Sequence, residues 1–115
     1  MKSVKQSFDL TDKVAVITGG AGLLGVQHAE AIAECGGIPI LIDINNNEGL
    51  KQAKRISEKY KVDCNFFHCD IIDENSVKEI ILKVINQFGS VDVLINNAAN
   101  NEKMEENANI SNYRL

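Results

Sequence analysis

The chain has 115 residues, of which 44% are hydrophobic and 24% are charged, and its formal net charge is −4. This length suits one domain and excludes an enzyme with separate cofactor and substrate domains. An acidic chain without a run of Lys or Arg is a poor candidate for binding nucleic acid, and no apolar run is long enough to span a membrane. We expect a cytoplasmic protein, because the N-terminus shows no secretory signal and the odd number of cysteines, three, favours reduced, structural thiols.

The first predicted elements are a strand and a helix. Residues 14–17 form a short apolar run before a glycine cluster, which is typical of a strand buried on both faces. Residues 22–35 show helical periodicity, and Gly36 and Gly37 are predicted to end this helix because glycine tolerates the left-handed conformation. The residues expected to face inward are Leu24, Ala29, Ile32 and Ala33.

The next predicted elements are a strand over residues 38–43 and a second helix capped by one of the asparagines at 45–47. The residues of this helix expected to face inward are Leu50, Ala53, Ser57 and Tyr60. Residues 62–69 are predicted to form a third strand. This segment is more polar than the first two strands, which favours a place at the edge of a sheet.

The last predicted elements are a third helix, capped by Asp73 and ended by Gly89, and a fourth strand over residues 91–96. The apolar series of the helix is Val77, Ile80, Ile81, Val84, Ile85 and Phe88. The order βαβαβαβ predicts a parallel sheet with right-handed crossovers. We expect residues 1–99 to form this unit and residues 100–115, which are rich in Asn and Glu, to form a polar loop or tail.

The turn from Thr18 to Gly25 lies between the first strand and the first helix and contains four glycines. A turn of this kind lets the backbone approach a diphosphate closely, and the free amides at the helix start then face the phosphate oxygens. A glycine-rich turn can also serve tight packing alone. Its place between strand and helix favours phosphate binding.

Asp43 ends the second strand, 18 residues after Gly25. A carboxylate in this place can accept hydrogen bonds from both ribose hydroxyls of an adenosine and would repel a 2′-phosphate. Because no Lys or Arg occurs between Thr18 and Leu50 to neutralise that phosphate, we expect NAD rather than NADP. The alternative is that Asp43 only caps the following helix.

These motifs resemble the short-chain dehydrogenase/reductase family over roughly residues 8 to 100. The turn is similar to the cofactor fingerprint of the family, although Leu23 stands where its shorter-chain branch has a glycine. Asp70 resembles an Asp that contacts the adenine, and residues 96–99 resemble the Asn-Asn-Ala-Gly signature, with Ala99 in place of the glycine. The resemblance implies a Rossmann-type α/β fold with strand order 3-2-1-4. It also implies a cofactor site made of Thr18, Gly19, Gly22, Leu23, Leu24, Gly25, Asp43, Ile44, Asp70, Ile71, Asn97, Ala98 and Ala99.

The catalytic residues of that family, a Ser and a Tyr-x-x-x-Lys motif, have no counterpart here. Tyr60 and Tyr113 are the two tyrosines, and neither has a lysine four residues later. We therefore expect the NAD-binding part of an oxidoreductase that, when complete, transfers hydride between nicotinamide and an alcohol or carbonyl substrate. The alternatives are a non-catalytic nucleotide-binding fragment or interaction module, and an extended-branch nucleotide-sugar epimerase or dehydratase.

The fourth strand would lie at an edge of the sheet, with its backbone and apolar side chains uncovered. An uncovered apolar edge favours pairing with another chain. We therefore expect self-association through this strand.

Overall fold

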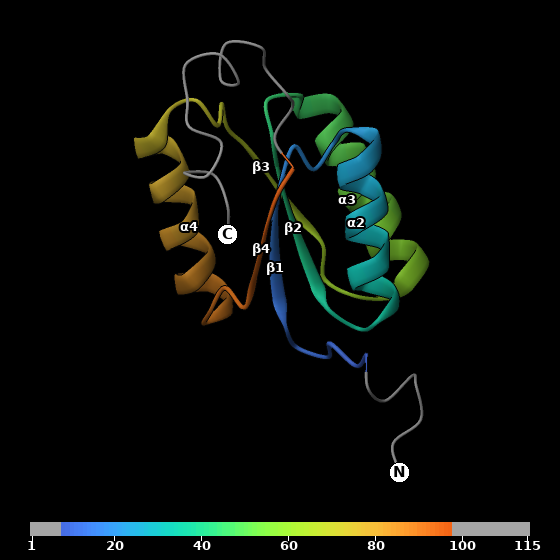
Figure 1. The fold of residues 1–115 in the computed structure, drawn as a ribbon. Coiled ribbons are helices and arrows are strands. Elements are labelled where there is room, and N and C mark those ends of the chain that lie inside the picture. Colours follow the sequence, from blue (N-terminus) through green and yellow to red (C-terminus); the bar gives the residue numbers. More distant parts are fainter. Residues whose placement is uncertain (1–7, 98–115) are drawn as a thin grey trace.

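The computed structural model describes residues 8–97, which form a four-stranded parallel sheet with helices on both faces (Figure 1). The elements in chain order are β1 (Val14–Thr18), α2 (Leu23–Glu34), β2 (Ile38–Asp43), α3 (Asn46–Tyr60), β3 (Asn65–His68), α4 (Glu74–Phe88) and β4 (Val93–Asn96). The strand order is β3-β2-β1-β4. This confirms the predicted Rossmann-type architecture. The boundary expected at residue 99 and the loop expected at 100–115 lie outside the described residues.

The two central strands, β1 and β2, are the most deeply buried part of the sheet. Their side chains alternate between two apolar cores, as the period of two along a strand requires. Val16 and Ile42 face the core that includes Val84 of α4. Ile17 and Leu41 face the opposite core, which α2 and α3 cover. The sheet is therefore buried between two layers of helices, which accounts for its continuous apolar strands.

α2 packs on the sheet through a row of small residues. Its buried positions are Gly25, Ala29 and Ala33, which recur every four residues along one face of the helix. The prediction that Leu24 faces inward was wrong, because its side chain is 53% exposed. Small side chains on the inner row let the helix backbone lie close to β1 and β2, and Leu24 then falls outside that row.

α3 also packs on the sheet partly through small residues. It buries Gly49, Ala53 and Ile56, whereas Leu50, which we expected inside, is 54% exposed. A Cβ added to Gly49 would lie 2.1 Å from the ring of Phe66, so the glycine gives this aromatic side chain its place against the helix.

The predicted helix ends are confirmed at the residues that carry them. The Asn45 side chain accepts the Glu48 amide at 3.2 Å at the start of α3, and the carboxylate of Asp73 accepts two amides at the start of α4. Gly36 and Gly89 have φ values of +88° and +91°, the left-handed conformation that ends a helix.

The edge strands are shorter than predicted. β3 covers Asn65–His68 rather than residues 62–69, because Lys61 adopts a left-handed conformation and the Val62 carbonyl accepts the Ser57 hydroxyl. β4 begins at Val93 rather than at residue 91.

Asp92 and α4 account for two further differences from the sequence interpretation. The Asp92 carboxylate accepts the Val14 amide at 2.8 Å, and the Asp92 amide donates to the Val14 carbonyl at 2.9 Å, so this residue joins β1 through both its side chain and its backbone. On α4, Ile80 and Val84 are buried as expected, but Ile85 is 42% exposed.

Candidate functional site

The carboxyl ends of the four parallel strands meet at one edge of the sheet, the upper edge in Figure 1. Thr18 ends β1, Asp43 ends β2 and Asn96 ends β4, while Asp70 follows the end of β3. The register pairs Thr18 with Asn96, and Asp43 with His68. The structure therefore brings most of the residues selected from the sequence to one edge, which is where open α/β sheets bind ligands.

The glycine-rich turn leaves β1 at this edge and leads into α2. Gly19 has a φ of +64°, a backbone conformation that residues other than glycine rarely adopt. The Gly20 amide donates to the Ile42 carbonyl at 3.1 Å, and the Gly22 amide donates to the Gly19 carbonyl at 3.2 Å. The turn is thus fixed both to itself and to the neighbouring strand.

The glycines of the turn meet different steric demands. A Cβ on Gly25 would lie 2.2 Å from the Gly19 carbonyl oxygen, and a Cβ on Gly20 would lie 2.8 Å from Leu41. A Cβ on Gly22 would lie 3.5 Å from its nearest neighbour, an ordinary contact. Packing within the described residues therefore requires glycine at 20 and 25 but leaves room at 22, on the outer side of the turn.

Within the described residues, Gly22, Leu23 and Leu24 at the start of α2 are exposed. Gly22 is the N-cap and provides no side chain to bind the first amides of the helix, and the first turn contains no acidic residue. The amides of Leu23, Leu24 and Gly25 precede the first internal bond of the helix, which runs from the Val26 amide to the Gly22 carbonyl. Such amides, together with the positive end of the helix dipole, attract an anion.

Asp43 lies directly beside this turn. One carboxylate oxygen accepts the Ala21 amide at 3.0 Å, and the other accepts the Asn45 amide at 2.9 Å. A carboxylate has about four lone-pair positions, so about two remain for a ligand. The Asn45 contact agrees with the alternative that Asp43 organises the start of α3, but the Ala21 contact also ties it to the glycine-rich turn.

Thr18 connects the ends of β1 and β4. Its hydroxyl is buried and donates to the Asn96 side-chain oxygen at 2.9 Å. The carboxamide of Asn96 is thereby oriented with its oxygen toward Thr18. Asn97 follows at the same edge, and its amide donates to the Ile95 carbonyl at 3.1 Å. Ala98 and Ala99, also predicted for the site, lie outside the described residues.

The segment after β3 only partly matches the predicted site. Asp70 is exposed, and its carboxylate accepts the Ile72 amide at 3.0 Å. Ile71 packs against the core beneath α4, whereas Ile72 is 65% exposed. Ile44, after β2, is 61% exposed. Ile44 and Ile72 are therefore the accessible apolar side chains that follow β2 and β3, and the sequence alone did not distinguish Ile72 from Ile71.

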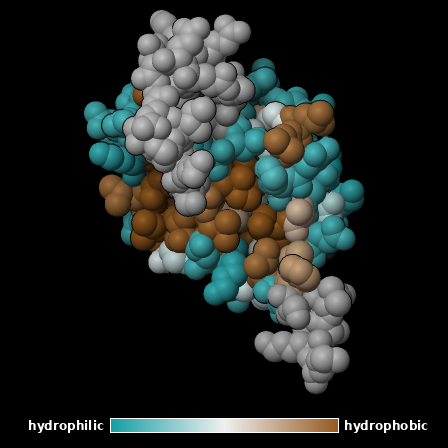
Figure 2. Space-filling view, viewed as in Figure 1, coloured by the Kyte–Doolittle hydropathy of each residue, from teal (hydrophilic) through white to brown (hydrophobic). Residues whose placement is uncertain are grey.

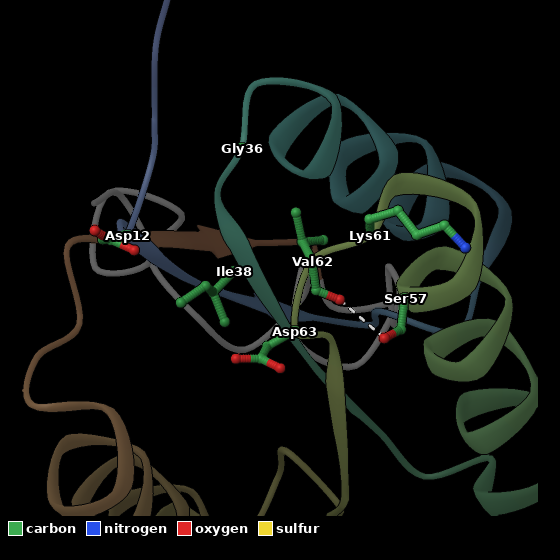
Figure 3. Close-up of a pocket in the computed structure, with 7 residues that line it drawn as sticks. All are labelled: Asp12, Gly36, Ile38, Ser57, Lys61, Val62 and Asp63. Atoms are coloured by element: carbon green, nitrogen blue, oxygen red, sulfur yellow. Dashed lines mark hydrogen bonds between the residues drawn. The ribbon is translucent and has the colours of Figure 1, made fainter.

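A hollow of about 470 Å³ lies at the opposite, amino end of the strands (Figure 3). The hydroxyl of Ser57 already donates to the Val62 carbonyl, and the Lys61 ammonium points away from Asp12 and Asp63. This hollow lies at the opposite end of the strands from Thr18, Asp43 and Asn96, so it does not form part of the candidate site.

The two buried cysteines, Cys64 and Cys69, have the character of structural thiols. Burial raises the pKa of Cys64 to about 12 and also raises the pKa of Cys69, so neither thiol ionises readily. Among residues 8–97, no three His, Cys, Asp or Glu side chains gather as metal ligands. Within the same residues, every helix is too short or too polar to cross a membrane.

Comparison of the sequence with protein families gives a match to short chain dehydrogenase over residues 13–114. The chain belongs to the short-chain dehydrogenase family. An uncharacterized oxidoreductase of Thermotoga maritima is 39% identical over 90 residues, which are 78% of this chain and 35% of that protein. A 15-hydroxyprostaglandin dehydrogenase of Bos taurus, whose name includes NAD(+), is 37% identical over 93 residues, which are 79% of this chain and 35% of that protein.

A solved reductase structure agrees with the fold. The NADPH-dependent 3-quinuclidinone reductase of Rhodotorula rubra superposes with a TM-score of 0.76 at 32% identity, over 82% of this chain and 35% of the reductase. The chain thus spans about a third of the length of the relatives it matches. The match to short-chain dehydrogenases does not favour the extended-branch alternative.

Proposed function

We propose that this chain binds NAD at the carboxyl edge of its sheet, with the diphosphate at the open start of α2 and the adenosine ribose on Asp43. One observation supports this most strongly. The Asp43 carboxylate lies 3.0 Å from the amide of Ala21, so the acid that would bind the ribose adjoins the turn that would bind the diphosphate. A single ADP moiety can span these two groups.

The charge at this edge supports NAD over NADP. The two accepting positions left on Asp43 match the two hydroxyls of an unmodified ribose, whereas a 2′-phosphate would bring negative charge beside the carboxylate. No Lys or Arg lies between Thr18 and Leu50 to offset this repulsion. The relatives named above include one with NAD(+) and one with NADPH in its name, so Asp43 is the basis for the choice.

We propose hydride transfer between nicotinamide and an alcohol or carbonyl group as the activity of the complete protein. The residues shown here would bind and orient the dinucleotide, and the nicotinamide would supply the hydride chemistry. The proposed cytoplasmic location rests on the reduced state of Cys35, Cys64 and Cys69.

Calorimetric titration of the chain with NAD⁺ and NADP⁺ tests the cofactor assignment. We expect NAD⁺ to bind at least about tenfold more tightly, a difference of ~1.4 kcal/mol in binding free energy. Equal affinities would remove the basis for choosing NAD, and no binding of either nucleotide would overturn the proposed site.

We further propose that two copies associate through β4. Within residues 8–97, this strand pairs with β1 on one side only and forms an edge of the sheet. Figure 2 shows apolar side chains gathered in the centre of the face where Figure 1 places β4. Val93 and Ile95 are half-buried and Leu94 is 39% exposed, and these three positions carry none of the charges or prolines that protect edge strands.

A further inference from the structure

Two consecutive amides tie the glycine-rich turn to β2, and only one of these contacts depends on a side chain. The Gly20 amide donates to the backbone carbonyl of Ile42. The next amide, that of Ala21, donates to Oδ2 of Asp43 at 3.0 Å. A hydrogen bond to a charged acceptor is stronger than one between neutral groups. The Asp43 side chain therefore contributes to where the turn lies relative to β2.

The position of the turn also sets the position of the helix that follows. Gly22 is the N-cap of α2, immediately after Ala21, and a Cβ on Gly25 would overlap the turn at Gly19. Because turn and helix are packed this closely, a shift of the Ala21 amide would shift the first amides of α2 with it.

We propose that Asp43 is also a positioning residue for the diphosphate-binding end of α2. Its ligand follows from the proposed function above, but the contact to Ala21 is made within the chain and exists without any ligand. The same carboxylate oxygen that holds the turn is available to a ribose hydroxyl. Asp43 thereby couples ribose binding to the placement of the amides that receive the diphosphate.

Two nucleotides separate this role from direct ribose binding: ADP and 2′,3′-dideoxy-ADP, which lacks the ribose hydroxyls. If Asp43 acted on the hydroxyls alone, Asp43→Ala would not weaken binding of the dideoxy nucleotide. The affinity would stay unchanged or rise, because a negative charge near the diphosphate is removed. We expect instead that Asp43→Ala weakens dideoxy-ADP binding about tenfold. Asp63→Ala is the matched control, since it removes an exposed carboxylate at the opposite end of the sheet.

Hydrogen exchange of the unliganded full chain, followed residue by residue by NMR, tests the contact itself. We expect the Ala21 amide to exchange at least about tenfold faster in Asp43→Ala, while the strand amides of Val16 and Ile42 keep their protection and report an intact fold. If Asp43→Ala does not fold, Asp43→Asn serves in its place. A carboxamide accepts at only one of its two ends, so either Ala21 or Asn45 should lose protection.

The outcomes distinguish this inference from the proposed function. Unchanged Ala21 exchange in the folded variant, or an unchanged or raised affinity for dideoxy-ADP, would overturn the positioning role even if NAD⁺ binds. If the unaltered chain binds neither nucleotide but its Ala21 protection depends on Asp43, the proposed function fails and the positioning contact stands.

Discussion

Replacing Gly25 by alanine should destabilise the fold by an amount that the geometry of the turn sets. The new Cβ would lie 2.2 Å from the Gly19 carbonyl oxygen, and an ordinary contact begins at 3.4 Å, so α2 and the turn must separate by about 1.2 Å. The obstructing atom belongs to the backbone and cannot rotate away. Overpacking of this kind costs about 1–3 kcal/mol. The better helix propensity of alanine returns at most about 1 kcal/mol. With an overpacking cost of about 3 kcal/mol, the net loss of stability is therefore about 2 kcal/mol.

Gly22→Ala is the matched comparison, because its Cβ would make only an ordinary contact at 3.5 Å. Its backbone angles, φ −78° and ψ 169°, are open to alanine. The expected loss of stability is no more than about 1 kcal/mol, the cost of a poorer N-cap. Gly22→Ala should nevertheless weaken nucleotide binding strongly, since the added methyl group would project where the diphosphate is proposed to lie. We expect at least about a tenfold loss of NAD⁺ affinity.

Thermal unfolding and calorimetry on the two variants measure these effects separately. A loss of 2 kcal/mol in a domain of this size lowers the melting temperature by roughly 10 °C. We therefore expect a clear drop for Gly25→Ala and a small one for Gly22→Ala. The reasoning fails if Gly25→Ala melts with the unaltered chain, or if Gly22→Ala binds NAD⁺ with undiminished affinity.

Three further predictions concern pH, helix packing and assembly. Hydrogen bonds from Ser76 lower the pKa of Asp73 below its ordinary value of 3.8, and the Val14 amide lowers that of Asp92. Their contribution to stability is thus present above pH 3.8 and is lost as the pH falls through the folded-state values. Melting temperatures measured at decreasing pH should show this loss of stability, and the loss should be smaller in Asp92→Asn. A double-mutant cycle on Glu30 and Arg55, whose side chains lie 2.8 Å apart and join α2 to α3, should give a coupling of about 0.5 kcal/mol that shrinks in salt. Leu94→Lys should lower the sedimentation coefficient to that of a monomer, and an unaltered chain that is monomeric at all concentrations would contradict the proposed assembly.

Local signals in the sequence predicted the order of the elements and the capped ends of the helices correctly, but not the ends of the two edge strands. Asp73 and Asn45 cap helices with the short polar side chains that bind first-turn amides, and Gly36 and Gly89 end helices at positive φ. These features depend on one or two residues and their neighbours. Parallel pairing then follows from the alternation of strands and helices, whereas the strand order was predicted from the family resemblance.

The inner faces of α2 and α3 were less predictable, because the residues inside them are small. Gly25 and Gly49 occupy inner positions that hydrophobicity alone would assign to the adjacent Leu24 and Leu50. Which residue lies inside depends on how closely each helix approaches the sheet, and this distance is a property of the packed layers. The contacts from Ala21 to Asp43 and from Thr18 to Asn96 were missed for a related reason, since they join residues more than twenty positions apart in the sequence.

The same reasoning explains why an unusual glycine spacing is compatible with the proposed site. Three physical requirements apply to such a turn: a positive φ, an outer position without a side chain, and a close approach between turn and helix. Gly19 meets the first, Gly22 leaves the second open and Gly25 meets the third. Leu23, which stands where a related pattern has glycine, is 82% exposed and is required by none of these roles. Leu23→Gly should therefore leave the placement of the turn unchanged, and a large shift of the Ala21 or Gly22 amide signals in its NMR spectrum would show that Leu23 does take part in forming it.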